Sequence, residues 1–158
     1  MSAEDRAEDL FRQAYAAQME GELDRAIELY RRSIEVHPTA EAHTFLGWTH
    51  SFMGRYDAAI EECRKAIEVD PEFGNPYNDV GAYLIELGRH DEAIPWLRRA
   101  LKARRYDPRH YPHFNLSRIY AHRFEYDRAI KELQRAIALE PGYTLARREL
   151  ARLSARLN

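Results

Sequence analysis

The sequence has one cysteine, seven glycines, seven prolines and no long apolar run. The single cysteine, Cys63, excludes an internal disulfide and is compatible with a reducing compartment. A bilayer-spanning helix needs roughly 20 consecutive apolar residues, which this chain lacks. Its opening stretch, MSAEDRAEDL, is acidic and does not resemble a secretory signal. Together these absences predict a soluble cytoplasmic protein.

Motifs of the common catalytic and cofactor sites are also missing. The chain has no HExxH motif, no glycine-rich phosphate loop and no nucleophile elbow. His110 and His113 lie three residues apart, and His43 and His50 lie seven apart. No cysteine or carboxylate completes a metal-ligand set around either pair. The sequence therefore predicts no enzyme activity, no metal and no cofactor.

Charged residues are plentiful and unevenly distributed along the chain. Scarce Gly and Pro, with prominent Ala, Leu, Glu and Arg, favour helices over disorder. Residues 1–97 hold 9 Lys and Arg against 20 Asp and Glu, whereas residues 98–158 hold 15 against 6. If the chain folds as a line of repeats, this polarity gives it a dipole along its length.

One motif recurs four times. Its copies are GELDRAIELYRRS, GRYDAAIEECRKA, GRHDEAIPWLRRA and FEYDRAIKELQRA, which begin at Gly21, Gly54, Gly88 and Phe124. The alanine shared by all copies recurs at steps of 33, 34 and 36 residues, at Ala26, Ala59, Ala93 and Ala129. A period of this length predicts a stack of helical repeats.

Two positions in the repeats carry a specific expectation. Cys63 occupies the place that Tyr30, Leu97 and Leu133 hold in the other copies, so we expect a buried hydrophobic residue rather than a reactive thiol. Phe124 stands at a turn where the other copies have glycine. That turn must either avoid a left-handed conformation or be strained by it.

The third repeat departs from the others near its end. The last small residue lies 5 positions before the closing proline in the other copies but 8 positions before it here, from Ala100 to Pro108. We expect the extra residues, within KARRY, to lengthen or bulge the helix, so that Arg104, Arg105 and Tyr106 protrude. Pro95 is expected to remove the first helical hydrogen bond or to delay the start of its helix.

The pattern resembles the tetratricopeptide repeat (TPR), in which aromatic-x2-Leu-Gly-x2-Tyr is followed by Ala-x3-Phe, Ala and Pro over about 34 residues. The best matches are Leu46-Gly47, Ala59, Ala66 and Pro71, and then Tyr77, Gly81, Ala93 and Ala100. The resemblance implies an all-α fold, an α-solenoid of four helix-turn-helix repeats in a right-handed superhelix with a C-terminal capping helix. It predicts one domain, 1–158, with repeats at about 7–39, 40–73, 74–109 and 110–142 and the cap at about 143–157.

The resemblance also implies a concave groove lined by the first helix of each repeat. In that geometry the candidate partner-binding residues are Phe11, Tyr15, Phe45, Trp48, Phe52, Asn78, Asp79, Phe114, Asn115, Arg118, His122, Arg148 and Arg152. Exposed aromatic clusters usually mark interaction sites. The two asparagines suit a peptide backbone, and the arginines suit a carboxylate. For Phe45, Phe52 and Phe114, packing between adjacent repeats is the alternative role.

These observations favour a non-catalytic adaptor or scaffold that binds a protein or peptide segment with apolar and acidic residues. The clamp by which some TPR proteins hold acidic chaperone tails is disfavoured, because its positions carry no Lys or Arg here. Nucleic acid is disfavoured by the acidic first half and the pI near 6.4. The alternative is a self-assembling scaffold that joins acidic N-terminal and basic C-terminal halves head to tail. A regulatory module for an enzyme also remains open.

Overall fold

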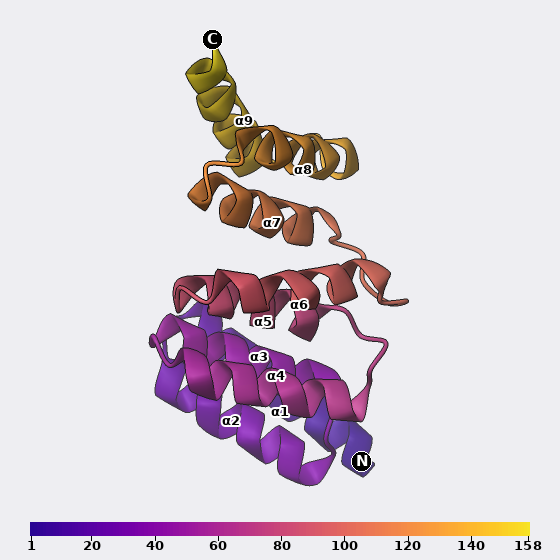
Figure 1. The fold of residues 1–158 in the computed structure, drawn as a ribbon. Coiled ribbons are helices and arrows are strands. Elements are labelled where there is room, and N and C mark those ends of the chain that lie inside the picture. The colour runs from indigo at the N-terminus through magenta and orange to yellow at the C-terminus, as the bar shows by residue number, and fades with distance from the viewer.

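The structure is a computed structural model that describes residues 1–158 as nine α-helices and no strand (Figure 1). The helices are α1 (Ala3–Met19), α2 (Leu23–Val36), α3 (Ala40–Phe52), α4 (Tyr56–Val69), α5 (Asn75–Glu86), α6 (His90–Lys102), α7 (His110–His122), α8 (Tyr126–Leu139) and α9 (Thr144–Leu157). The predicted all-α fold, four helical pairs followed by one further helix, is confirmed. No helix combines the length and the apolar character that a bilayer crossing requires.

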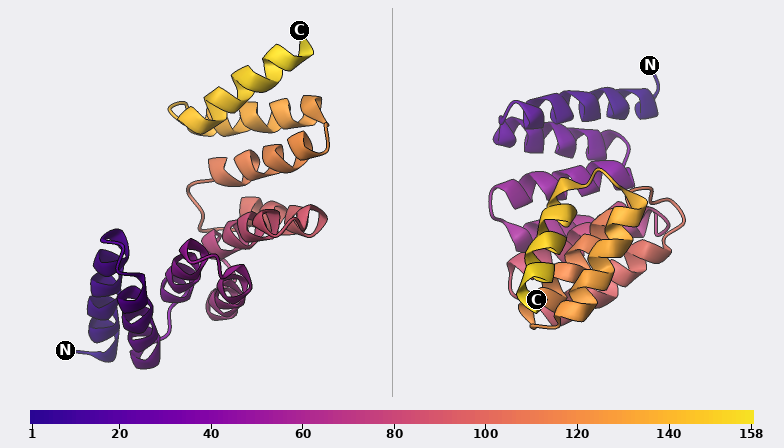
Figure 2. Two further views of the ribbon diagram at one scale, coloured as in Figure 1. Left: turned by 90° about the vertical axis from the view of Figure 1, so that its left-hand side faces the viewer. Right: turned by 90° about the horizontal axis from the view of Figure 1, so that it is seen from above.

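The helices form a curved stack, an α-solenoid, with the two termini at opposite ends (Figure 2). Pairing follows the chain: α1 with α2, α3 with α4, α5 with α6 and α7 with α8, and α9 packs on α8. The first helices of neighbouring pairs also touch, α1 with α3, α3 with α5 and α5 with α7. Because these first helices approach one another across the repeats, they line the inner side of the stack.

Small residues set the spacing within each pair. A β-carbon on Gly47 would lie 2.9 Å from the carbonyl oxygen of Ala59, and one on Gly81 would lie 2.4 Å from Cδ2 of Leu97. Real β-carbons do not approach neighbours this closely, so both helix crossings depend on glycine. The four repeated alanines are fully buried at these interfaces, as is Cys63, which confirms its expected packing role.

The turn within each pair uses a left-handed residue. Gly21, Gly54 and Gly88 have φ of 81°, 72° and 75°, and Phe124 has φ of 61° at the equivalent place in the fourth pair. The left-handed region is open to glycine but costs other L-residues about 1–2 kcal/mol. Phe124 therefore adopts the strained alternative, and its side chain is 76% exposed.

Arg104 and Arg105 of the inserted segment after α6 are exposed, as predicted, but the segment itself does not bulge away from the stack. It folds back on the loop before α5, where the N–H of Arg105 donates to the carbonyl of Glu72 and the N–H of Gly74 donates to the carbonyl of Arg105, both at 3.0 Å. Arg105 also pairs with Asp70. Tyr106, predicted to be exposed, is only 3% exposed. Its burial follows from Gly74, where a β-carbon would collide with Tyr106 at 2.3 Å.

Pro95 also corrects an expectation. Helix α6 begins at His90, five residues before the proline, so the helix does not start late. Pro95 lies within the helix on its exposed side, and the helix continues to Lys102 without the hydrogen bond that its missing N–H would have made.

Phe124→Gly is expected to stabilise the protein. Glycine removes the left-handed penalty of about 1–2 kcal/mol but adds about 0.4–1 kcal/mol of unfolded-state entropy. The free energy of unfolding should therefore rise by about 1 kcal/mol, as measured by urea denaturation followed by circular dichroism. Gly88→Ala, at a matched turn, should lower it by a similar amount. Equal stability of Phe124→Gly and wild type would contradict the strain at this turn.

Candidate partner-binding groove

Five of the predicted groove residues form one aromatic cluster on α1 and α3. The ring centroid of Phe45 lies 5.1 Å from that of Phe11, 5.9 Å from that of Tyr15 and 5.9 Å from that of Trp48. Phe52 lies 4.9 Å from Trp48 and is 54% exposed, and Tyr15 is 42% exposed. Phe45 fills the junction between the first two repeats, its alternative role, while the rings on either side of it leave apolar surface accessible.

A pocket of about 350 Å³ continues the groove from this cluster toward α5 and α7. Its lining residues are Thr44, Phe45, Trp48, Phe73, Asn75, Asn78, Asp79, Tyr106, Pro108 and Tyr111. Phe73, Tyr106 and Pro108 were not among the predicted site residues. They come from the two loops that pair before α5 and after α6. The lengthened spacing from Ala100 to Pro108 was the only sign of Tyr106 and Pro108 in the sequence, and Phe73 had none.

The two predicted asparagines are hydrogen-bonded to each other. The side-chain amide of Asn115 donates to Oδ1 of Asn78 at 3.0 Å and joins α7 to α5. Arg118 donates to Oδ1 of Asn115 at 3.3 Å and to Glu86 at 2.8 Å. Asn78 and Asn115 are only 8% and 7% exposed. In this arrangement the amides hold neighbouring repeats together, and a peptide backbone would have to displace that contact to reach Asn115.

Asp79 lies in the pocket wall without a cationic partner. No ion pair in the structure includes it, and no Lys, Arg or His lines the pocket. Burial raises the pKa of this carboxyl from 3.8 to about 7, and a contact with the Asn78 side chain opposes the rise only partly. Asp79 is thus the one ionisable acid of the pocket that is poised to change charge near neutral pH.

The remaining predicted residues lie toward the C-terminal end and do not join the aromatic cluster. Phe114 packs edge-on against Tyr143, with ring centroids 5.3 Å apart. The ring of His122 lies tilted against that of His90, with centroids 4.3 Å apart. Arg152 pairs with Glu149 at 3.0 Å, and Arg148 is exposed on α9. The predicted set therefore divides into an aromatic N-terminal group and a C-terminal group that is polar except for Phe114.

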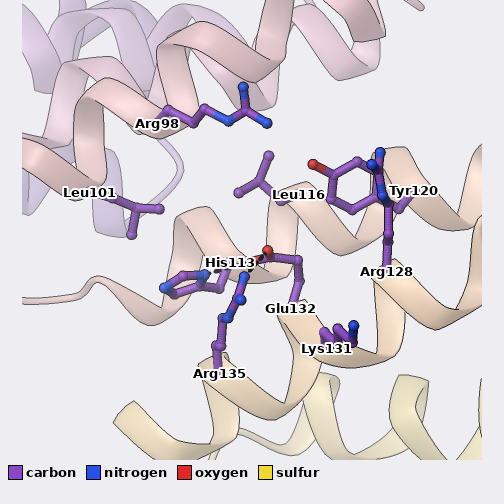
Figure 3. Close-up of a pocket in the computed structure, with 9 residues that line it drawn as sticks. All are labelled: Arg98, Leu101, His113, Leu116, Tyr120, Arg128, Lys131, Glu132 and Arg135. Carbon is purple, nitrogen blue, oxygen red and sulfur yellow. Dashed lines mark hydrogen bonds and ion pairs between the residues drawn. The ribbon is translucent and has the colours of Figure 1, made fainter.

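A second pocket, of about 410 Å³, lies where α6, α7 and α8 meet (Figure 3). Arg98, Arg128, Lys131 and Arg135 surround it. Its carboxylate, Glu132, is already engaged, since it bonds to Nδ1 of His113 at 2.7 Å and accepts from Arg135 at 2.5 Å.

The same arrangement occurs two helical pairs earlier, between α3 and α4. His43 contacts Glu62 at 2.8 Å, and Lys65 donates to Glu62 at 3.2 Å. Burial alone would raise the pKa of Glu62 and of Glu132, but the histidine and cation contacts outweigh it and lower the pKa of both. Each of these clusters of a histidine, a glutamate and a cation joins the two helices of its own repeat, which is a structural role.

Comparison with known proteins agrees with this architecture. Three models of the tetratricopeptide repeat match residues 10–40, 40–73 and 73–140, so that together they span nearly the whole chain. The chain belongs to the TPR family. TPR proteins are in general non-catalytic proteins of protein–protein interaction, and they include peptide-binding members.

Individual proteins are similar to this chain in sequence or in structure. Small glutamine-rich tetratricopeptide repeat-containing protein 2 of Mycosarcoma maydis is 32% identical over 91 residues, which cover 56% of this chain and 26% of that protein. The chain thus spans about a quarter of that relative. The structure of pilF from Pseudomonas aeruginosa has a TM-score of 0.90 and 22% identity, and covers 98% of this chain and 70% of its own.

A third likeness is to YrrB, described as a TPR protein with an unusual peptide-binding site. It has a TM-score of 0.68 and 22% identity, and covers 93% of this chain and 75% of its own. At these identities the two solved structures support the fold of this chain.

Asp79→Asn is expected to change how stability depends on pH. Because the folded-state pKa of about 7 lies above the unfolded value of 3.8, the native state keeps a proton that the unfolded chain loses. Wild-type stability therefore falls as pH rises from about 4 to 7, whereas the asparagine variant lacks this loss.

Urea unfolding at pH 4 should give equal stabilities for wild type and Asp79→Asn. At pH 8 the variant should be more stable by up to about 4 kcal/mol, because the folded and unfolded pKa values are about 7 and 3.8 and each pKa unit corresponds to about 1.36 kcal/mol. Asp57→Asn, an exposed substitution in α4, serves as the matched control. A stability difference that stays constant across this range would show that Asp79 is not held in a desolvated site.

Proposed function

We propose that this chain is a non-catalytic adaptor that binds a peptide segment or partner protein along the groove lined by α1, α3, α5 and α7. The observation that carries the proposal is the aromatic cluster of Phe11, Tyr15, Phe45, Trp48 and Phe52, which leaves apolar surface exposed on the inner side of the stack. Exposed apolar clusters beside a pocket are typical of interaction sites.

The character of the outer surface also favours the inner face as the partner-binding site. Second helices of the pairs carry charged side chains linked to neighbours on the same helix or turn, such as Arg89 with Glu92 and Arg25 with Glu22. Exposed ion pairs of this kind contribute little to binding or stability and keep a surface solvated. The inner face has the aromatic rings and the pocket instead.

The chemistry of the groove suggests a segment that is apolar where it meets Trp48. At the other end, Arg148 is exposed and has no ion pair, while Arg118 and Arg152 are partly neutralised by Glu86 and Glu149. Acidic residues of a ligand would therefore bind Arg148 most readily, since the other two arginines would first have to exchange partners.

The test is affinity capture from a lysate of the source cell, read by mass spectrometry. Trp48→Ala/Phe52→Ala removes the accessible rings of the cluster and should weaken binding of a groove partner by at least about 10-fold, equivalent to about 1.4 kcal/mol. Phe124→Ala removes an exposed aromatic ring outside the cluster and should retain the partner. Circular dichroism checks that both variants fold. A partner retained equally by all three proteins would exclude the groove as its site.

Self-assembly is the second candidate, and the two ends of the stack support it. Helix α1 exposes Glu4, Asp5, Glu8 and Asp9 at one end, and α9 exposes Arg147, Arg148, Arg152 and Arg156 at the other. Opposite charges on opposite ends permit a head-to-tail contact between copies.

Such assembly is expected to dissociate with salt, because exposed charges are screened beyond about 8 Å at physiological ionic strength. Light scattering at low salt should then show masses above 18.6 kDa that return to 18.6 kDa at high salt. A monomer at low salt and high protein concentration would remove this candidate.

A further inference from the structure

We propose that the pocket between α3, α5 and α7 receives a lysine or arginine side chain of the bound segment, with the Asp79 carboxylate as its counter-charge. The inference rests on the proposed groove-binding function and specifies the chemistry of the ligand at one position. The sequence predicted a ligand with apolar and acidic residues, and this inference adds a basic residue to it.

Asp79 is an acid without a cationic partner in the pocket wall. Asp79 lines the pocket, and the titratable groups that face it are Tyr83, Tyr106 and Cys63, none of which supplies a positive charge. Transfer of a carboxylate into such surroundings is costly unless a cation accompanies it. In the free protein Asp79, which is partly exposed, has its pKa raised by burial to about 7, so that part of this cost is avoided by protonation near neutral pH. A cationic side chain in the pocket would stabilise the ionised form instead.

The walls of the pocket combine aromatic rings with a single carboxylate. Aromatic rings of Phe45, Trp48, Phe73, Tyr106 and Tyr111 line the pocket around Asp79. Aromatic faces attract ammonium and guanidinium groups, and Lys and Arg place long apolar stems against such rings while the charged head reaches a polar group. A pocket with aromatic walls and one carboxylate therefore suits a basic side chain better than a purely apolar one.

The inserted segment after α6 builds part of the pocket wall. Tyr106 and Pro108 belong to the lengthened segment after α6, which the backbone pairing with Glu72 and Gly74 holds against the groove. The corresponding connections elsewhere are three residues shorter and have no equivalent of this segment. The insertion thus gives one junction of the repeat stack a pocket of its own.

A metal ion does not fit the same pocket. Asp79 is its only carboxylate, and no group of three or more His, Cys, Asp or Glu residues in the chain is placed to hold a metal. Hard cations such as Ca²⁺ and Mg²⁺ require several oxygen ligands. A basic side chain needs only one counter-charge together with the aromatic surface.

The test is selection of a random-peptide phage library on the full chain. Parallel selections use wild type, Asp79→Asn, Trp48→Ala and the control Glu92→Gln, which removes an exposed carboxylate of α6 outside the groove. We expect wild type and the control to enrich peptides with a Lys or Arg flanked by apolar residues. Asp79→Asn should still enrich apolar peptides but without the preference for Lys or Arg. Trp48→Ala should enrich neither the basic nor the purely apolar peptides.

A synthesised peptide from the selection then tests the contact directly by calorimetry. Replacing its basic residue with norleucine should weaken binding to wild type at least about 10-fold, as should Asp79→Asn with the original peptide. The two changes together should cost little more than either one, since they remove the same interaction. Affinity for wild type should also rise several-fold from pH 6 to pH 8, and Asp79→Asn should not show this rise.

The outcomes separate this inference from the proposed function. Trp48-dependent peptides without a basic residue, or additive effects of norleucine and Asp79→Asn, would overturn the inference and leave the groove function standing. Peptides whose enrichment is unaffected by Trp48→Ala, or no enriched peptide at all, would overturn the groove function and the inference with it.

Discussion

The close approach of paired helices at small residues is the constraint on which the rest of the structure depends. Gly47 in α3 and Gly81 in α5 bring these first helices against their second helices with no room for a β-carbon, and the small residues Ala14 and Ser117 hold the matching places in α1 and α7. One face of each first helix is thereby buried in its pair, while another face lies on the inner side of the curve, where no second helix covers it. Aromatic residues placed there, such as Tyr15 and Phe52, remain accessible even though they are large and apolar, and their exposure supports the proposed binding role.

The inner surface is aromatic at its N-terminal part and charged at its C-terminal part, and its charged groups differ in whether they have an ion-pair partner. The N-terminal part is aromatic, and Phe45 links α1 to α3 within it. At the C-terminal part, Arg118 and Arg152 are paired with carboxylates of the same stack. Between the two lies Asp79, which has no such partner and lines the pocket walled by Tyr106. The groove thus has an acid without a cationic partner, between an uncharged aromatic surface and a surface whose Arg118 and Arg152 are already paired with carboxylates.

The sequence predicted whatever depends on the repeat itself. The helical pairs, the burial of Cys63 and the gathering of the five aromatic residues all follow from matched positions in successive copies. It did not predict contacts that depend on how one repeat is placed against the next. Asn78 and Asn115 were expected to face a ligand, yet they bond to each other, because their separation is set by the packing of α5 on α7. Tyr106 was expected to protrude, because nothing local to KARRY shows that Gly74, about thirty residues earlier, leaves space for its ring.

The central claim is that a partner binds on the inner face of the stack. Its most direct test is chemical-shift mapping by ¹H–¹⁵N NMR of the full chain, with the partner segment that capture or selection identifies. The account predicts that the largest shifts fall on α3, on α5 and on residues 103–108, with the indole N–H of Trp48 among them. Shifts confined to the outer surfaces of α2, α4, α6 and α8, or to the ends of the stack at α1 and α9, would contradict it.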